Sequence, residues 1–166
     1  MKVFVEEQGF KRWIIISIIT LPLIAGIVPL FIEDIESLGL NQEGVIGLTF
    51  IFSIVALVLL LILSIRLKTK IDEQGIHYQF FPIHLSQKFI SWDDLKSCEV
   101  IKYNSLIRYG GYGYRFSFFK NKGTAINIGG NHGIQLVMKS GKRLLIGTQK
   151  EQEAKVVLKT YQSKIN

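Results

Sequence analysis

Cysteine is nearly absent from this sequence, in which Cys98 is the only one among 166 residues. A single cysteine excludes a disulfide within the chain, and without a neighbouring thiol it excludes a zinc site built from cysteines. Free cysteines are among the most buried residues of proteins. We therefore expect Cys98 to be a small buried residue of a reduced cytoplasmic domain.

Motifs for catalysis, metal binding and nucleotide binding are also missing. His77, His84 and His132 are dispersed, and neither an H-E-x-x-H nor a G-x-S-x-G pattern occurs. The glycine clusters at 110–113 and 129–133 lie between strand-like segments, whereas a phosphate-binding glycine loop leads from a strand into a helix. The sequence predicts no catalytic residue, no metal site and no cofactor, and it favours a protein that is not an enzyme.

Charged residues are missing from two long apolar runs, 14–32 and 45–65. Each run has about 20 residues and, as a helix, would reach across roughly 30 Å of hydrocarbon. A buried core helix would be shorter and would carry a polar stripe, and the first run exceeds the usual length of a signal peptide's apolar region. We expect residues 14–65 to form a hairpin of two transmembrane helices.

Basic residues are absent from the connector 33–44, which carries four acidic residues. They flank the two runs instead, as Lys2, Lys11, Arg12, Arg66, Lys68 and Lys70. By the positive-inside rule, this asymmetry predicts a multi-pass protein of the cytoplasmic membrane, with both termini in the cytoplasm and the acidic connector outside. Residues 1–13 are then a short cytoplasmic segment.

Residues 66–166 change to short alternating runs separated by glycine turns, the pattern of consecutive antiparallel hairpins. The expected strands are 69–73, 76–81, 88–91, 98–104, 112–119, 124–128, 134–139 and 143–147.

The end of the chain has helical spacing. Its apolar residues are Ala154, Val157, Leu158, Tyr161 and Ile165, which share one helix face. The pattern Thr148 to Glu151 predicts a capping box, in which both side chains bond to backbone N–H groups at the start of the helix. We expect this amphipathic helix to close one end of the β domain.

About seven antiparallel strands closed by a C-terminal helix form the plan of a pleckstrin-homology-like (PH-like) split barrel. The motifs that carry a resemblance are the Gly75 turn, Ser91-Trp92-Asp93-Asp94-Leu95, the glycine cluster 110–113 and Ile146-Gly147-Thr148-Gln149. With them, the chain from about residue 66 to residue 161 resembles bacterial membrane proteins that carry a cytoplasmic PH-like domain. The resemblance covers about three fifths of the chain. It implies a fold and a membrane setting, and it supplies no catalytic residue.

Positive charge is concentrated in the predicted β domain, which contains 17 Lys and Arg but only 7 Asp and Glu. Beside an anionic leaflet each nearby cation contributes about 1 kcal/mol of attraction. Positive-inside bias and ordinary solubility account for the excess equally well. Nucleic acid is not an expected partner, because the basic residues are scattered and no nucleic-acid-binding motif occurs.

Two segments form the candidate binding surface. The first comprises Arg108, Tyr109, Gly110, Gly111, Tyr112, Gly113, Tyr114 and Arg115, and the second is the basic hairpin Lys139, Lys142 and Arg143. We expect Gly110 and Gly111 to form a positive-φ turn or bulge that leads into a strand. We expect Tyr112, Tyr114, Phe116 and Phe118 to share one face of that strand.

The favoured function is a membrane-anchored binding or scaffolding protein at the cytoplasmic face, contacting a partner membrane protein or anionic lipid headgroups of the bilayer. A first alternative is an assembly factor or accessory subunit of a membrane protein complex, in which small residues such as Gly26 and Gly47 let helices pack closely. An enzyme of unknown reaction is the second alternative.

Overall fold

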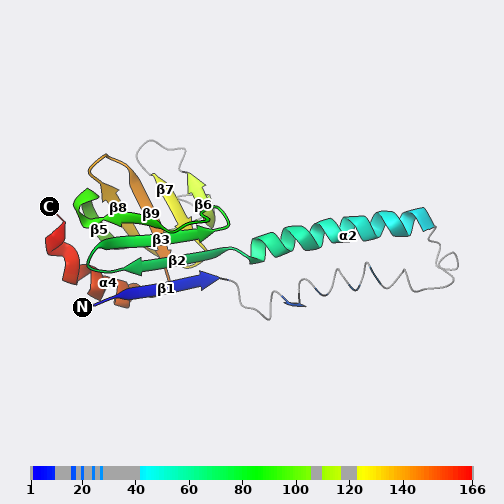
Figure 1. Cartoon of the computed structure of the whole chain (residues 1–166), viewed down its shortest axis with the longest axis horizontal. Coiled ribbons are helices and arrows are strands. Elements are labelled where there is room, and N and C mark those ends of the chain that lie inside the picture. Colours follow the sequence, from blue (N-terminus) through cyan, green and yellow to red (C-terminus); the bar gives the residue numbers. More distant parts are fainter. Residues whose placement is uncertain are drawn as a thin grey trace. The chain divides into compact units, whose positions relative to one another are not determined.

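The computed structural model describes residues 2–9, 16–17, 20, 24, 27, 42–105, 110–116 and 123–165. The chain divides into two compact units (Figure 1). One unit is a mainly β domain made of Met1–Gly9 together with Arg66–Asn166, and the other is the segment Phe10–Ile65. The segment Phe10–Ile65 is therefore an insertion between the first and second strands of the β domain.

The first sheet of the β domain has the strand order β1-β2-β3-β4, and every neighbouring pair is antiparallel. Its strands are β1 (Phe4–Gly9), β2 (Arg66–Ile71), β3 (Gly75–Phe81) and β4 (Lys88–Ser91). A short 3-10 turn, η3 (Trp92–Asp94), then leads into the second sheet.

The second sheet has the order β5-β8-β9-β7-β6. Its strands are β5 (Leu95–Lys102), β6 (Gly113–Phe116), β7 (Thr124–Asn127), β8 (His132–Met138) and β9 (Arg143–Thr148). The pair β7–β9 is parallel, while the other pairs are antiparallel.

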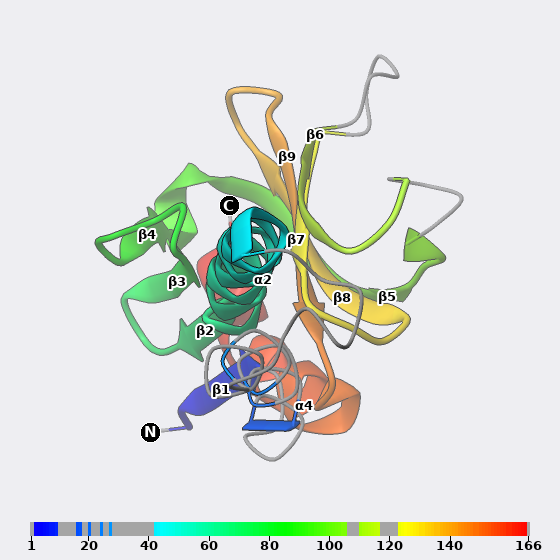
Figure 2. The same cartoon turned by 90° about the vertical axis from the view of Figure 1, so that its right-hand side faces the viewer.

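Helix α4 (Glu151–Tyr161) packs against β1, β5 and β8, so it contacts both sheets (Figure 2). Its buried face consists of the predicted residues Ala154, Val157, Leu158 and Tyr161. The Tyr161 ring stacks on Trp92 with centroids 5.5 Å apart, and its hydroxyl donates a 2.6 Å hydrogen bond to the Lys2 carbonyl. The predicted amphipathic helix is confirmed, and the one-turn helix η4 (Gln162–Lys164) follows it.

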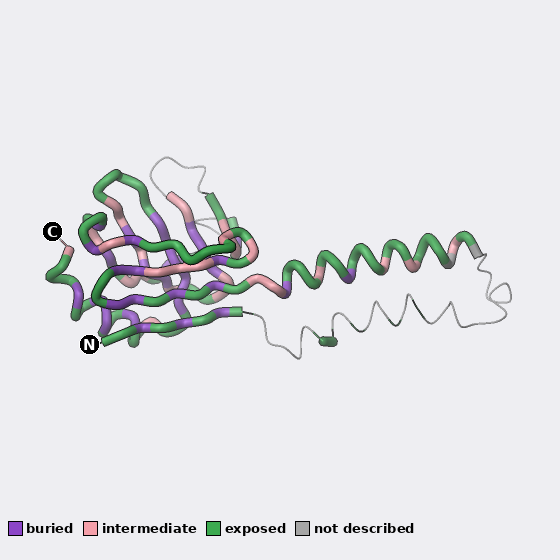
Figure 3. Tube along the Cα trace, viewed as in Figure 1, coloured by how far each residue is buried: buried purple, intermediate pink, exposed green. Residues whose placement is uncertain are grey.

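Residues 1–13 are predicted to be a separate segment outside the β domain, whereas Phe4–Gly9 forms β1 at the edge of the first sheet. Buried and exposed residues alternate along β1 (Figure 3). The buried residues are Phe4, Glu6 and Gln8. Gly9 is the register partner of Arg66, so the inserted segment leaves and re-enters the sheet at neighbouring positions.

Polar side chains of β1 hold the start of α4. The buried Glu6 carboxylate accepts a 2.6 Å hydrogen bond from the Thr148 hydroxyl and a 2.8 Å bond from the Gln149 amide. Gln8 adds a buried 2.8 Å bond from its amide nitrogen to the Gly147 carbonyl. The strand before the insertion is thereby fixed to the last strand of the domain.

The predicted capping box between Thr148 and Glu151 is wrong. The helix N-cap is Lys150, which makes no side-chain capping bond, and Thr148 accepts from the Lys150 amide at 3.1 Å. Glu151 pairs instead with His132 at 3.2 Å and with Lys155. The carboxylate that bonds to the Thr148 hydroxyl is that of Glu6 and not that of Glu151. Glu6 is too distant in sequence for a local motif to predict this contact.

The split barrel of seven antiparallel strands is confirmed only in coarser form, as a mainly β domain of two sheets with a C-terminal helix. In the described part of the chain the two sheets do not close into a barrel. The prediction of consecutive antiparallel hairpins is wrong for β7, which does not pair with the next strand, β8. Instead, β7 and β8 lie on opposite sides of β9, and β7 is parallel to β9.

The inserted segment contains helix α2 (Gln42–Leu63), which confirms a helix over the second apolar run. Of the described helices, it alone contains a stretch, Ile46–Leu63, long and apolar enough to cross a membrane. Most of its apolar side chains are exposed (Figure 3). In the first run the described residues Ile16, Ser17, Thr20, Ile24 and Ile27 are helical, and the rest of that run and most of the connector lie outside the described residues.

Candidate functional site

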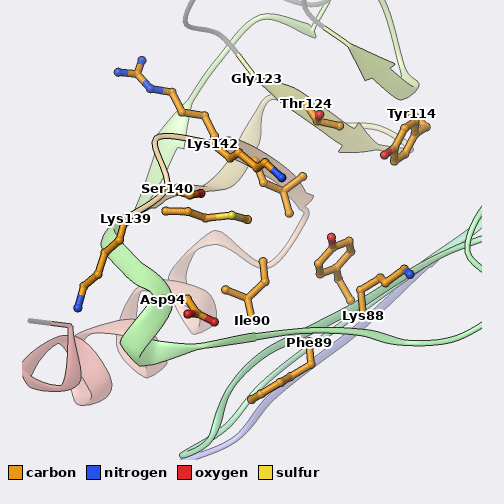
Figure 4. Close-up of a pocket in the computed structure, with 14 residues that line it drawn as sticks. Lys88, Phe89, Ile90, Asp94, Tyr114, Gly123, Thr124, Lys139, Ser140 and Lys142 are labelled. Carbon is orange, nitrogen blue, oxygen red and sulfur yellow. The ribbon is translucent and has the colours of Figure 1, made fainter.

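A pocket of about 630 Å³ lies between β4, one of the two edge strands of the first sheet, and the second sheet (Figure 4). The first sheet and η3 contribute Tyr78, Lys88 and Asp94 to its wall. The opposite wall is formed by Tyr114 of β6, the start of β7 and the turn that joins β8 to β9. The pocket therefore combines segments that are far apart in sequence.

Four cationic residues belong to the wall of this pocket. Lys88 belongs to β4, while Lys139, Lys142 and Arg143 belong to the β8–β9 turn and the start of β9. None of the three lysines forms an ion pair with another residue in the described part of the chain. Among the lining residues Asp94 alone carries a carboxylate, so the wall has an excess of positive charge.

Two backbone hydrogen bonds define the β8–β9 turn that carries Lys139 and Lys142. The Met138 amide donates to the Lys142 carbonyl, and the Gly141 amide donates to the Met138 carbonyl, both at 2.9 Å. Gly141 has φ +82°, a conformation that glycine adopts without strain. In Figure 4 the Lys139 side chain extends away from the pocket, so Lys88 and Lys142 are the lysines best placed to hold a ligand.

Two tyrosines line the pocket near Lys88. Tyr78 is the register partner of Lys88, and Tyr114 lies in β6 on the other sheet. Burial, and then the neighbouring Tyr114, raises the pKa of the Tyr78 hydroxyl above its usual value. The Tyr78 hydroxyl thus stays protonated at neutral pH and can donate a hydrogen bond.

His84 packs edge-on against both Tyr78 and Tyr114, at centroid distances of 5.6 and 5.4 Å. Burial, and then the charge of Lys88, lowers the pKa of its imidazole. His84 is therefore neutral at pH 7 and serves as an aromatic support for the two tyrosines.

The glycine cluster forms a turn before β6, which confirms that prediction. Gly110, Gly111 and Gly113 all have positive φ, at +71°, +129° and +106°. The cluster is anchored by Asn127, whose Oδ1 accepts a 2.9 Å bond from the Gly113 amide. The buried Asn127 amide nitrogen also donates to Tyr103 at 2.7 Å and to Ser105 at 3.0 Å.

The first predicted surface is divided by the fold. Tyr114 enters the pocket, and its ring contacts Phe116 at 5.1 Å, so those two aromatic residues share a face as expected. Arg115 instead folds back toward the turn, where its Nε donates a 3.1 Å bond to the Tyr112 carbonyl. Arg108, Tyr109 and Phe118 lie outside the described residues.

All three residues of the second predicted surface, Lys139, Lys142 and Arg143, belong to the pocket wall, although the Lys139 side chain points away from the pocket. Sequence reasoning missed the partners of this surface, Lys88 and Tyr78. Lys88 opens a predicted strand, but no local signal tells which strand of the other sheet faces it.

This arrangement is suited to binding a small anion or an anionic group. A volume of several hundred Å³ is typical of small-molecule sites, and lysines act on phosphate as compact point charges. Within the described ranges, no group of three or more His, Cys, Asp or Glu side chains is placed to hold a metal ion.

Comparison with known protein families finds no family model that matches this chain. Comparison with curated proteins finds no significant relative.

Proposed function

We propose that this chain is an integral membrane protein whose PH-like β domain binds anionic phospholipid headgroups at the cytoplasmic face. The observation that carries this proposal is the composition of the pocket, which is lined by Lys88, Lys142 and Arg143 together with two tyrosines and a single carboxylate, Asp94. We assign the pocket a binding role and not a catalytic one, since cations and phenol hydroxyls can hold and orient a phosphodiester without reacting with it.

The anchor in this proposal is the inserted segment 10–65. Helix α2 supplies one crossing of the bilayer, because Ile46–Leu63 has the length and apolar character that a crossing needs. Gly9 and Arg66 are register partners in one sheet, so both ends of the segment lie on the same side of the membrane. The segment must therefore cross an even number of times, which supports a two-helix hairpin.

The side of the membrane follows from charge. Lys and Arg are concentrated at the ends of the inserted segment and in the β domain, whereas the connector 33–44 has none. The positive-inside rule then places the β domain and both termini in the cytoplasm. An anionic leaflet faces the domain there and supplies the headgroups.

Titration of the full chain in detergent tests the headgroup site. Soluble short-chain phosphatidylglycerol and phosphatidylcholine of equal chain length are compared by native mass spectrometry, and glycerol phosphate is tested separately. We expect phosphatidylglycerol to bind more tightly than phosphatidylcholine. Replacing Lys88 and Lys142 with Ala should weaken it by about 10- to 30-fold, because each lysine contributes about 1 kcal/mol.

The matched control is the double variant Lys96→Ala and Lys159→Ala, which removes the same charge from exposed positions on β5 and α4 outside the pocket. Its affinity should equal that of the parent chain. Equal losses in both double variants would contradict the proposed site. Preference for free glycerol phosphate would assign the pocket to a soluble ligand, and a co-purified acidic protein displaced by neither lipid would assign it to a protein partner.

A further inference from the structure

The β3–β4 loop, residues 82–87, exposes apolar side chains that a soluble domain would normally bury. Leu85 is 81 % exposed, the largest fraction for any large hydrophobic side chain in the described residues. Ile83 is 55 % exposed, and Phe81 at the end of β3 is 39 % exposed. These three residues form an apolar tip on the first sheet.

Hydrogen bonds to residues of β3 hold the tip in shape. The His84 amide donates a 2.7 Å hydrogen bond to the Phe80 carbonyl. The Gln79 side-chain amide donates to the carbonyls of His84 and Leu85 at 3.2 and 2.9 Å. His84 packs between Tyr78 and Tyr114, while its neighbours Ile83 and Leu85 remain exposed. The apolar tip is thus a preformed feature and its exposure does not need a conformational change.

The apolar tip lies at the end of the sheet from which the inserted segment departs. Gly9, Arg66 and Phe81 are aligned there by strand register. Arg66 is three residues beyond Leu63, the last residue of α2, so at most about 10 Å of chain joins them. Phe81 is one strand spacing from Arg66, about 5 Å away. The short connection from Leu63 to Arg66 and the pairing of Arg66 with Phe81 therefore hold this end of the sheet close to wherever α2 leaves the bilayer.

The charge around the apolar tip suits a lipid surface. No Asp or Glu occurs between Glu73 and Asp93, and Lys88 follows the loop directly. Phe116, 63 % exposed, adds a further apolar side chain on the other sheet, where its ring contacts Tyr114 beside His84. Apolar side chains bordered by lysine are the composition that binds the interface of an anionic bilayer.

We propose that the β3–β4 loop inserts Ile83 and Leu85 into the interfacial region of the bilayer and so fixes the orientation of the β domain on the membrane. This inference rests on the membrane anchorage in the proposed function and does not require the headgroup site. Lipid is the proposed partner of the apolar tip because the short connection from α2 to Arg66 and the pairing of Arg66 with Phe81 hold the tip at the membrane surface.

Depth-dependent fluorescence quenching of the reconstituted full chain tests the insertion. An environment-sensitive fluorophore is attached to single cysteines introduced by Leu85→Cys, Gln74→Cys or Leu57→Cys in a Cys98→Ala background. Gln74 lies in the β2–β3 turn at the opposite end of the same strands, and Leu57 lies in α2. The vesicles contain zwitterionic lipid with a nitroxide quencher near the headgroup or deep in the acyl chains.

We expect the headgroup-proximal quencher to reduce emission at position 85 at least twofold more than at position 74. The deep quencher should act most strongly at position 57. Adding Lys142→Ala, which removes a lysine of the pocket and leaves the β3–β4 loop intact, should leave quenching at position 85 unchanged, and this separates loop insertion from headgroup binding.

Equal quenching at positions 85 and 74, with position 57 quenched, would overturn loop insertion alone. Absence of quenching at position 57 would show that α2 does not lie in the bilayer, and it would contradict both the proposed membrane anchorage and this inference. Blue-shifted emission at position 85 without lipid quenching would show that protein covers the apolar tip, and this result also overturns the proposal.

Discussion

Thr148 donates a 2.6 Å hydrogen bond to the buried carboxylate of Glu6, and so joins the last β strand of the domain to the strand that precedes the inserted segment. Both side chains are almost completely buried, and the same Thr148 oxygen accepts from the Lys150 amide. The bond links β1 to the end of β9, between two residues that are 142 positions apart in the sequence.

Replacing Thr148 with Val should destabilise the domain by about 1–3 kcal/mol, because the buried carboxylate and the Lys150 amide each lose a partner. The measurement is denaturant unfolding of the full chain in detergent, followed by tryptophan fluorescence. The control is Thr160→Val on the exposed part of α4, where Thr160 bonds only to the Val156 carbonyl and the cost should stay near 0.5 kcal/mol or less. Equal costs for the two substitutions would argue against a special role for the Glu6 contact.

Gly75 and Gly141 provide a matched pair of substitutions to Ala, since both have positive φ. A Cβ atom at Gly75 would come within 2.1 Å of the Ile90 carbonyl oxygen, whereas a Cβ at Gly141 has no atom within 4 Å. Gly141→Ala should cost about 1–2 kcal/mol from backbone strain alone. Gly75→Ala should cost about 1–3 kcal/mol more, because β4 must move away from β3. Thermal unfolding of the two variants compares them, and similar melting temperatures would refute the steric argument.

Cys98 should be nearly unreactive in the folded protein. Burial, and then the neighbouring Glu99, raises the pKa of its thiol to about 12, so little thiolate exists at pH 8. We expect a disulfide reagent to label the folded chain at least about 100-fold more slowly than the chain in denaturant. A Gln74→Cys variant, which places a second thiol on an exposed turn, serves as the positive control. Rapid labelling of the folded parent chain would show that Cys98 is accessible.

Asp72 should make the stability of the β domain depend on pH. Burial is the largest influence and raises the pKa of the carboxyl, but the Lys70 ammonium and the amides of Gln74 and Gly75 together outweigh burial and lower it. The unfolded chain therefore binds a proton more readily than the folded chain. The stabilisation is complete above the unfolded pKa of about 3.9 and is lost as the pH falls through the lower folded value.

Asp72→Asn should consequently be less stable than the parent chain at pH 7, and the difference should shrink below about pH 4. Urea unfolding midpoints measured between pH 7 and pH 3 test this expectation. Asp93→Asn, at an exposed position of η3, should show a difference that stays small over the same range. A constant deficit for Asp72→Asn at all pH values would contradict the role assigned to its charge.

Local patterns were sufficient to predict much of the β domain. Alternation and glycine turns correctly indicated all eight strands that follow α2, and helical spacing indicated the buried face of α4. β1 escaped prediction because two of its three inward residues, Glu6 and Gln8, are polar and resemble a solvent-exposed segment. Their burial is compensated by bonds to Gly147, Thr148 and Gln149, which no window of neighbouring residues contains.

The part of the candidate site that is contiguous in sequence could be predicted. Lys139, Lys142 and Arg143 could be recognised as a basic hairpin because the glycine turn that presents them is contiguous in sequence. Lys88 and Tyr78 join them only through the packing of two sheets, and Arg115 is removed from the pocket by a bond to the Tyr112 carbonyl. Side-chain direction at a sheet edge depends on long-range pairing, which charge and spacing do not specify.

The pairing of β1 with β2 also orders the biogenesis of the protein. β1 is synthesised before the inserted segment, and its partner strand is synthesised after it. The first sheet can therefore be completed only when both ends of the segment have reached the same compartment. In the proposed topology, a chain in which only one of the two helices has crossed the bilayer has β1 and β2 on opposite sides of the membrane. The first sheet cannot form in such a chain, so a complete sheet requires correct membrane insertion.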